Sequence, residues 1–350
     1  MASPPLQAEA FKRWLTTAAR ECGAHSAACL RLDNPLLLRR IAANNREVAA
    51  WLAAGGHAQM DYLERMFPAR ADPGATFPFA RSVIVVSFTN SWGESSAGHP
   101  FPAPLGGSPV GYISAYAREA DYHLTGHQIL AALQQKLGNP LQQAVAAVDT
   151  RPVYETLFAT LGGLGVIGSN GLLRTPALGT RVFVACLFVD LLLPEVIHEL
   201  PMPFACTSCR ACLANCPTGA IAAERAIAAG RCISYLTIEK KTPLTPAEAT
   251  TVGDWLFGCD CCTAVCPPVA ADRRIPVDLD WLLRSSAAEI RRTLKGNATA
   301  YAGVSRLRRN AVVVLNNQKT DRALELLSWV RQNSGSQLVC QQIDELCGPT

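Results

Sequence analysis

The cysteines between residues 206 and 266 have the spacing that most clearly predicts chemistry in this chain. The run CTSCRACLANCP has C-x2-C-x2-C-x3-C-P spacing, and a lone cysteine and the motif CDCCTAVCP follow it. In bacterial-type runs of this kind the fourth cysteine ligates a second iron–sulfur cluster, so a further group of cysteines is required. We therefore expect two [4Fe–4S] clusters, each completed from the other half of the segment. The predicted ligands are Cys206, Cys209, Cys212 and Cys266 for one cluster, and Cys216, Cys232, Cys259 and Cys262 for the other.

Zinc and disulfides are the alternative uses of these thiols. Zinc also takes four thiolates at C-x2-C spacing, but usually as two pairs. Disulfides need an oxidising compartment and are favoured in small secreted domains, whereas this chain has 350 residues and begins without an apolar signal core. We therefore expect a reducing, cytoplasmic setting. Cys261 adjoins Cys262 and could ligate in its place, although Cys262 has the commoner offset to Cys266.

Apolar patterns predict the elements that position these thiols. Helical spacing covers residues 7–22 and 36–54, and β-rich apolar segments at 81–88 and 144–148 predict strands. The stretch VFVACLFVDLLLP from Val182 predicts one or two buried strands, because it is shorter than the ~18 to 20 apolar residues of a membrane-spanning helix. We expect no membrane segment.

The predicted fold class is α/β (α+β), in three parts. Residues 1–200 form an α/β domain, 201–272 a bacterial-type two-cluster ferredoxin-like domain, and 273–350 a small helical region. The net charge of +4 permits a nucleic-acid partner without arguing strongly for one. A basic stretch in the third part could contact phosphates, or could simply be a solvated helix face. Its members are Arg284, Arg291, Arg292, Lys295, Arg306, Arg308 and Arg309.

The glycine-dense segment LGGLGVIGSNG at 161–171 predicts backbone that approaches a ligand closely or adopts positive φ. A set of tight turns is the alternative. Gly163, Gly165 and Gly168 match the letters of a dinucleotide fingerprint, but no acidic residue follows at the expected distance. The segment is therefore a candidate cofactor wall without being a nucleotide motif.

Several segments together show a resemblance to a known family. They include GGHAQMDYLERM (55–66), YAREADYH (116–123), VDTRPVYETLFATLGGLGVIG (148–168), RCISYLTIEKK (231–241) and LRRNAVVVLNN (307–317), besides CPTGAI and GCDCCTAVCP. Over nearly its whole length the chain resembles the epoxyqueuosine reductases, which use cobalamin and two iron–sulfur clusters. The cysteine run alone would fit many ferredoxin-like domains, whereas RCISYLTIEKK and ADYH are much more specific.

The resemblance implies removal of the epoxide oxygen of epoxyqueuosine, in the anticodon loop of a GUN-type tRNA, at a cobalamin centre fed by the clusters. Loss of the oxygen as water needs protons, hence a general acid. In the family this acid is the aspartate of an RDYH motif, which falls on Asp121 here, after Ala120 rather than arginine. We expect burial against the corrin to raise its pKa. Asp121 could also cap a helix starting at Tyr122, and we interpret His123 as structural rather than as a cobalt ligand.

The resemblance also places Gly163, Gly165 and Gly168 at the cobalamin wall, with Ser169 beside them and Asp121 as a further cofactor contact. This chain departs from the family pattern there. Val166 and Ser169 replace a tryptophan and a lysine, and Ala185 and Cys186 stand where glycine and glutamate are usual. These departures leave the substrate less certain than the cofactor.

Two other functions compete with this one. NGLLRTPALGTRV is reminiscent of corrinoid reductive dehalogenases, which act on small molecules, but those enzymes normally carry a twin-arginine export signal. A non-catalytic electron carrier would not need the roughly 200 residues that precede the first cluster cysteine. We therefore expect a monomeric tRNA-modifying enzyme that takes electrons from an external donor.

Overall fold

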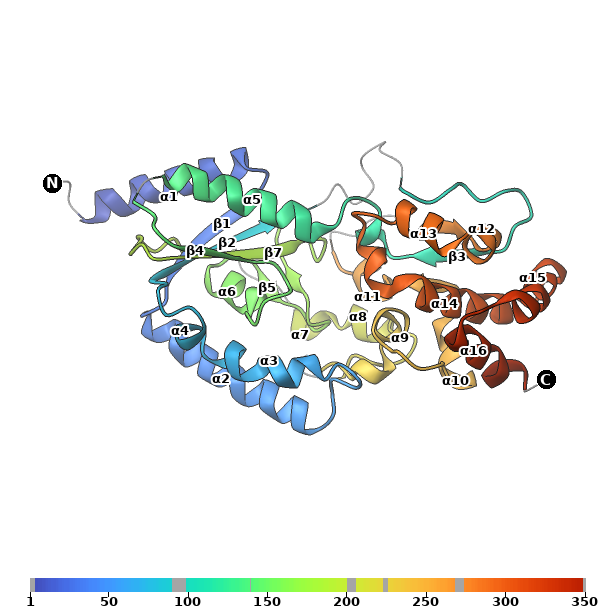
Figure 1. The fold of residues 1–350 in the computed structure, drawn as a ribbon. Coiled ribbons are helices and arrows are strands. Elements are labelled where there is room, and N and C mark those ends of the chain that lie inside the picture. Colours follow the sequence, from blue (N-terminus) through green and yellow to red (C-terminus); the bar gives the residue numbers. More distant parts are fainter. Residues whose placement is uncertain are drawn as a thin grey trace.

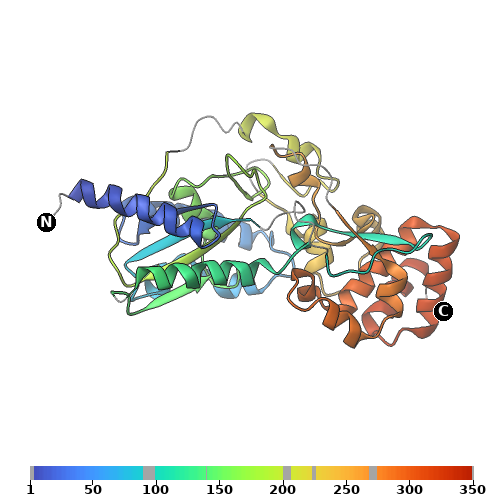
Figure 2. The same cartoon turned by 90° about the horizontal axis from the view of Figure 1, so that it is seen from above.

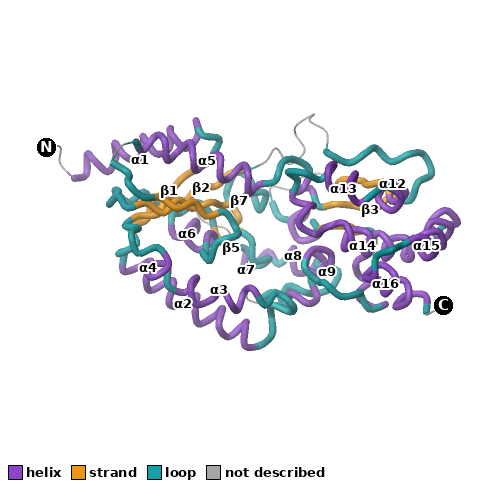
Figure 3. Tube along the Cα trace, in the orientation of Figure 1, coloured by secondary structure: helices purple, strands orange, loops and turns teal. Residues whose placement is uncertain are grey.

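The computed structural model describes residues 4–89, 99–138, 140–199, 206–222, 226–267 and 274–348. These residues form two lobes side by side, with the N-terminal segments in one and the C-terminal helices in the other (Figure 1). The view from above places the two termini at opposite ends of the molecule (Figure 2). Strands lie near the middle of each lobe, and helices surround them (Figure 3).

The first lobe is built on a four-stranded antiparallel sheet with strand order β1-β2-β7-β4. Strand β2 is buried along all seven residues, which explains its unbroken apolar sequence. The predicted strands at 81–88 and 144–148 are confirmed within one residue, and the apolar stretch from Val182 supplies β7. The strands are β1 (Ser26–Arg31), β2 (Ser82–Phe88), β4 (Ala144–Ala147) and β7 (Phe183–Val189).

Helices cover both faces of this sheet. Alternate residues of β2 point to opposite faces, so Ile84 and Val86 pack under one helical layer while Val83 and Val85 pack under the other. The predicted helices at 7–22 and 36–54 are confirmed as α1 and α2. One layer contains α1 (Pro4–Glu21) and α5 (Tyr122–Leu137); the other contains α2 (Pro35–Ala53), α3 (Tyr62–Ala71), α4 (Pro73–Thr76) and α6 (Glu155–Leu161).

The second lobe has a three-stranded sheet of order β8-β3-β9, in which β3 runs parallel to β8 and antiparallel to β9. Strand β3 comes from the segment expected to belong wholly to the first domain, so the lobes do not follow the linear division at residue 200. The strands are β3 (Val110–Ile113), β8 (Trp255–Phe257) and β9 (Ile275–Asp278). The helices are α9 (Ile233–Ile238), α10 (Pro246–Val252), α12 (Leu279–Arg284), α13 (Ala287–Thr293), α14 (Gly303–Gln318), α15 (Asp321–Asn333) and α16 (Gln337–Cys347).

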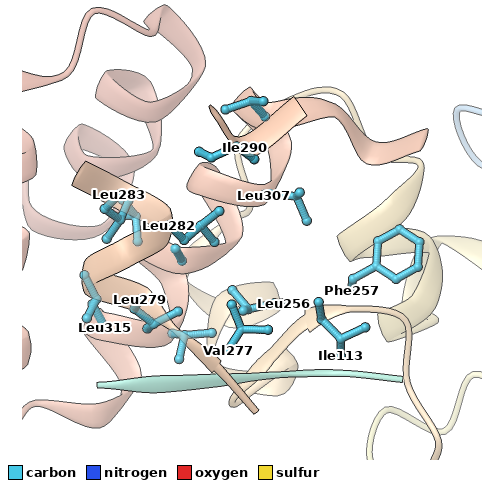
Figure 4. Packing of buried hydrophobic residues seen from close by; sticks show 14 of the residues in the cluster. Ile113, Leu256, Phe257, Val277, Leu279, Leu282, Leu283, Ile290, Leu307 and Leu315 are labelled. Atoms are coloured by element: carbon cyan, nitrogen blue, oxygen red, sulfur yellow. The ribbon is translucent and has the colours of Figure 1, made fainter. Parts of the chain in front are cut away.

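Apolar side chains from this sheet and the helices above it form one continuous core (Figure 4). Ile113 and Val277 of the sheet face Leu282 and Leu307 of the helices. Burial of such side chains stabilises a fold by about 1.5–3 kcal/mol each. The core therefore ties residues from three distant parts of the sequence into a single unit.

Two polar residues of α14 are fully buried and bind backbone carbonyl groups of α9, of the segment that follows it and of β8. Arg309 donates hydrogen bonds to the carbonyl oxygens of Leu236, Lys240 and Thr242. Asn310 donates to the carbonyl oxygens of Thr237 and Leu256. The last two residues of the LRRN motif therefore fix the backbone of the RCISYLTIEKK motif through hydrogen bonds.

The cysteine segment joins the two lobes through short elements. Among the described residues, no helix is long and apolar enough to cross a membrane. The remaining elements are β5 (Val166–Ile167), β6 (Leu173–Arg174), α7 (Cys206–Cys209), α8 (Ala211–Ala214), α11 (Cys261–Ala264), and the 3₁₀ turns η1 (Ala115–Ala117), η3 (Ala229–Arg231) and η4 (Ala298–Ala302).

Candidate active site

A cavity of about 470 Å³ lies where the sheet of the first lobe meets the cysteine segment. Its walls are mostly apolar, with Phe183 and Leu173 from the first lobe and Ile221 and Ile233 from the cysteine segment. Polar side chains also open onto it, and they are mainly acids, hydroxyls and thiols. They include Ser114, Tyr116, Tyr122, Asp149, Glu155, Asp260 and the cysteines described below.

Only one of the two predicted sets of cluster ligands lines the cavity. Cys216, Cys232, Cys259 and Cys262, the second set, all line it. The members of the first set do not line it, and Cys209 is exposed to solvent. The second set thus faces the cavity, while the first contains a thiol at the surface.

Neighbouring thiols influence one another within these sets. Burial raises the pKa of Cys212, and the thiols of Cys266 and Cys206 add to that rise. Burial likewise raises the pKa of Cys262 to about 12, with smaller contributions from Cys232, Cys212 and Cys216. Cluster assembly must therefore displace protons from these groups.

Two polar side chains lie close to the thiols. Asn170 and Thr180 partly offset the rise in pKa that burial causes at Cys262 and Cys266, respectively. Within the described residues neither Asn170 Nδ2 nor Thr180 Oγ1 has a hydrogen-bond partner, so both could donate to a cluster sulfur, a contact by which proteins set reduction potentials. Cys261 also lines the cavity and lies within hydrogen-bonding reach of Cys259, so the geometry does not separate it from the predicted ligands. In the described ranges, no three His, Cys, Asp or Glu side chains converge closely enough to hold one metal ion.

Asp121 is the N-cap of α5. Its Oδ1 accepts a hydrogen bond from the backbone N–H of His123 at 3.0 Å and lies 2.7 Å from His123 Nδ1. The capping role considered from the sequence is therefore observed. The loop before the cap is held by the second lobe, because Asp121 N–H donates to Gly296 O and Asn297 Nδ2 donates to the carbonyl oxygen of Ala117.

His123 connects Asp121 to a second carboxylate. Its Nε2 lies 3.4 Å from Asp149 Oδ2, and Tyr122 Oη donates to the same oxygen at 2.6 Å. The Tyr122 ring stacks on Phe183 of the cavity wall, with centroids 4.4 Å apart and planes 2° apart. Asp149 itself has φ of +59°, a left-handed conformation that a non-glycine residue adopts at some cost.

The charges of this cluster differ from the sequence-based expectation. Burial raises the pKa of Asp121, but hydrogen bonds from the His123 side chain and backbone outweigh it, so the net pKa of Asp121 is lowered. The same bond with Asp121, followed by Asp149, raises the pKa of His123 to about 9 despite burial. Within the protein alone, the proton at neutral pH therefore resides on His123.

Glu155 is a second acidic group on the cavity. Its Oε1 accepts a hydrogen bond from the backbone N–H of Asp149 at 3.1 Å, and burial raises its pKa to about 7. Sequence reasoning did not single out Asp149, Glu155 or Tyr122 as functional. All three lie in segments that carry the family resemblance, VDTRPVYE and ADYH. Their spacing along the chain, however, does not indicate that they share a cavity.

The glycines predicted to form the cofactor wall have another role in the structure. A methyl group on Gly163 would overlap the backbone of His198, and one on Gly165 would overlap the carbonyl oxygen of Arg174. Of the described cavity-lining residues, none is Gly163, Gly165, Gly168 or Ser169, although Asn170, Leu172 and Leu173 follow directly. Ser169 Oγ instead donates to the carbonyl oxygen of Cys206 at 3.4 Å. These glycines shape the hairpin that presents its neighbours to the cavity.

The basic stretch expected from the sequence is only partly available for a ligand. Arg309 is buried, Arg308 donates to the carbonyl oxygen of Leu282, and Arg306 donates to that of Ala302. Arg284 packs over the Trp329 ring and pairs with Asp280. The structure leaves three exposed cations on and beside α13, which are Arg291, Arg292 and Lys295.

Comparisons with known proteins match the sequence of this chain to one family. A model of a 4Fe-4S double cluster binding domain matches residues 205–268, and a model described as epoxyqueuosine reductase QueG, DUF1730, matches residues 70–150. The chain is 32% identical to the epoxyqueuosine reductase of Vibrio cholerae, over 77% of this chain and 74% of the relative. It is 34% identical to that of Gloeobacter violaceus, over 75% and 84%.

Solved structures share the fold. An epoxyqueuosine reductase crystallised with an epoxyqueuosine-modified tRNA-Tyr stem loop superposes with a TM-score of 0.79 at 22% identity, covering 95% of this chain and 88% of that one. The enzyme from Streptococcus thermophilus gives a TM-score of 0.76 at 20% identity, covering 97% and 91%.

Proposed function

The chain belongs to the epoxyqueuosine reductase family, and we propose that it reduces epoxyqueuosine to queuosine in the anticodon loop of a GUN-type tRNA. The reaction removes the epoxide oxygen as water and consumes two electrons and two protons. Cobalamin, an external electron donor and a cytoplasmic setting are parts of this proposal.

One observation carries the proposal. The same cavity is lined by the thiols of the second predicted cluster and by Asp149, the carboxylate through which the Asp121–His123–Asp149 network reaches it. A reductive deoxygenation needs both an electron source and a proton source at one substrate. Electrons would enter near the exposed Cys209 and leave through the set that faces the cavity.

The apolar walls of the cavity suit a large flat cofactor. Val182, Phe183 and Val184 line it from the first lobe, and Ile221 and Ile233 line it from the cysteine segment. We propose that cobalamin is held against these residues, with the segment 170–173 as one edge. When bound, it would supply a reduced cobalt centre for the two-electron step.

The chain itself supplies one of the two protons, and the other comes from solvent. Asp121 is the proposed general acid, and at neutral pH the proton that it delivers rests on His123. His123 Nδ1–H points at Asp121 Oδ1 over 2.7 Å, so the imidazolium can pass this proton to the carboxylate as the carboxylate protonates the leaving oxygen. Asp149 Oδ2 lies 3.4 Å from the other imidazole nitrogen, so its charge favours the imidazolium form that makes this transfer.

The test is anaerobic reconstitution with iron, sulfide and cobalamin, followed by reaction with epoxyqueuosine-containing tRNA under a strong reductant. Nucleosides are then identified by mass spectrometry. We expect queuosine from the native chain and none from Asp121→Asn, which should retain its clusters and corrin spectrum. Asparagine caps helices as well as aspartate does, so a loss of activity would not come from loss of the cap. Bound corrin and clusters without conversion by the native chain would discard the tRNA substrate.

A further inference from the structure

Three side chains from distant segments meet where the two lobes adjoin. Glu239, at the C-terminal end of α9, accepts a hydrogen bond on Oε1 from Tyr62 Oη at 3.4 Å and on Oε2 from Tyr301 Oη at 3.3 Å. Tyr62 begins α3 in the first lobe, while Tyr301 lies in η4 of the second. The carboxylate therefore presents one oxygen to a hydroxyl group of each lobe.

The carboxylate is only loosely satisfied. Both contacts are longer than the ~2.7 Å of a good O–H···O bond, and no Lys or Arg forms an ion pair with Glu239 in the part of the chain described. Tyr301 is 60% exposed, an unusual state for a large aromatic residue, and the Arg306 guanidinium lies over its ring, 5.8 Å from the centroid. By contrast the backbone is fixed, because Arg306 donates to the carbonyl oxygens of Ile238 and Glu239.

The position of this group relates it to the proposed reaction. Gly296, shortly before η4, accepts the backbone hydrogen bond of Asp121. The charge of Asp149, which lines the cavity, contributes to the raised pKa of Tyr301 after burial and Glu239. The Glu239 group is thus attached to the segment that carries the proposed acid and lies within electrostatic range of the cavity.

We propose that Tyr62, Glu239 and Tyr301 form a binding site for a guanine-type base. Such a base presents two adjacent donors, N1–H and the N2 amine, which match the two oxygens of a carboxylate. The exposed ring of Tyr301 provides a stacking surface, as enzymes that act on bases commonly use. The inference deepens the proposed function, since the first base of a GUN anticodon would be held here while its epoxide-bearing substituent reaches Asp121.

The experiment measures binding, so it does not depend on turnover. Fluorescence anisotropy of the reconstituted protein is recorded with two unmodified anticodon stem loops, one with guanosine at the first anticodon position and one with inosine, which lacks the N2 amine. We expect the native chain to prefer guanosine by about 10- to 100-fold, the effect of one hydrogen bond to a charged group. Glu239→Gln should abolish that preference. Equal binding of both loops by the native chain, or binding of neither, would overturn the proposal.

Further variants separate stacking from hydrogen bonding and from folding. Tyr301→Leu should weaken both loops by about 5- to 150-fold, while Tyr301→Phe should retain most of the affinity. Glu21→Gln, which alters an exposed glutamate paired with Lys136, is the matched control and should change nothing. If Glu239→Gln lowers the affinity only for the epoxyqueuosine-containing loop, Glu239 binds the amine of the modification, and its proposed recognition of the guanine base is refuted.

Discussion

Replacing His123 with glutamine tests whether the imidazolium supplies the proposed acid. With a pKa of about 9, His123 is roughly 97% protonated at pH 7.5, against about 9% for a histidine of pKa 6.5. Glutamine keeps a hydrogen-bonding side chain but cannot hold that proton. Because a positioned acid contributes about 10²- to 10⁴-fold to rate, we expect the turnover of His123→Gln to fall by at least about 100-fold.

The pH dependence gives the sharper signature. In the native chain, activity should decline as pH rises through about 9, when His123 loses its proton. The difference between about 9 and 6.5 corresponds to at most about 3 kcal/mol of folding free energy, since the side chain is 27% exposed. Because the folded-state pKa is raised, this stabilisation is complete below pH 6.5 and is lost as pH rises through 9.

Two assays check these values. Single-turnover conversion of the modified stem loop from pH 6 to 10 measures how the rate declines with pH. Chemical denaturation of native and His123→Gln chains over the same range measures the difference in their free energies of unfolding. That difference should shrink between pH 6.5 and 9. A variant with the native rate and the same alkaline decline would refute the role of His123, and a stability difference independent of pH would refute its raised pKa.

Three further predictions concern single side chains. Asp149→Asn removes a carboxylate beside the imidazole, so NMR titration should show a lower pKa for His123, and the alkaline decline in activity should move to lower pH. Cys262→Ser should lose about half of the cluster iron in anaerobic iron analysis, whereas Cys261→Ser should keep it; the reverse result would exchange their roles. Arg309→Met removes the donor to three carbonyl groups, of which that of Leu236 is buried, and should lower the free energy of unfolding by about 1–3 kcal/mol, seen as a lower denaturation midpoint; an unchanged midpoint would show that water replaces the guanidinium.

The strands and helices of the first lobe were predictable because their signal is local. A buried strand such as β2 shows as a continuous apolar run, and α2 shows as a helical repeat that begins at Pro35 after the capping residue Asn34. The division into three consecutive domains was less successful as a description of packing. Strand β3 is four residues long and pairs with strands more than 140 positions later, which no local pattern reveals.

The basic stretch at 284–309 shows how composition can mislead. A cation in the sequence is counted the same whether it faces solvent or the core, but Arg309 is buried against backbone carbonyl groups. The pKa of Asp121 was equally hard to predict from the sequence. Burial alone would raise it, but the ring of His123, two residues away, turns back to form a hydrogen bond that lowers it. Both outcomes depend on side-chain direction.

By itself, the sequence determined the cysteine spacing, the family resemblance and the position of Asp121, because each is a property of neighbouring residues in order. The tertiary structure alone placed the second set of thiols and the acidic network around one cavity. It also brought Tyr62, Glu239 and Tyr301 together from segments separated by 177 and 62 positions. Such meetings depend on how lobes pack against each other, and packing is a cooperative property of the whole chain that spacing along it does not encode.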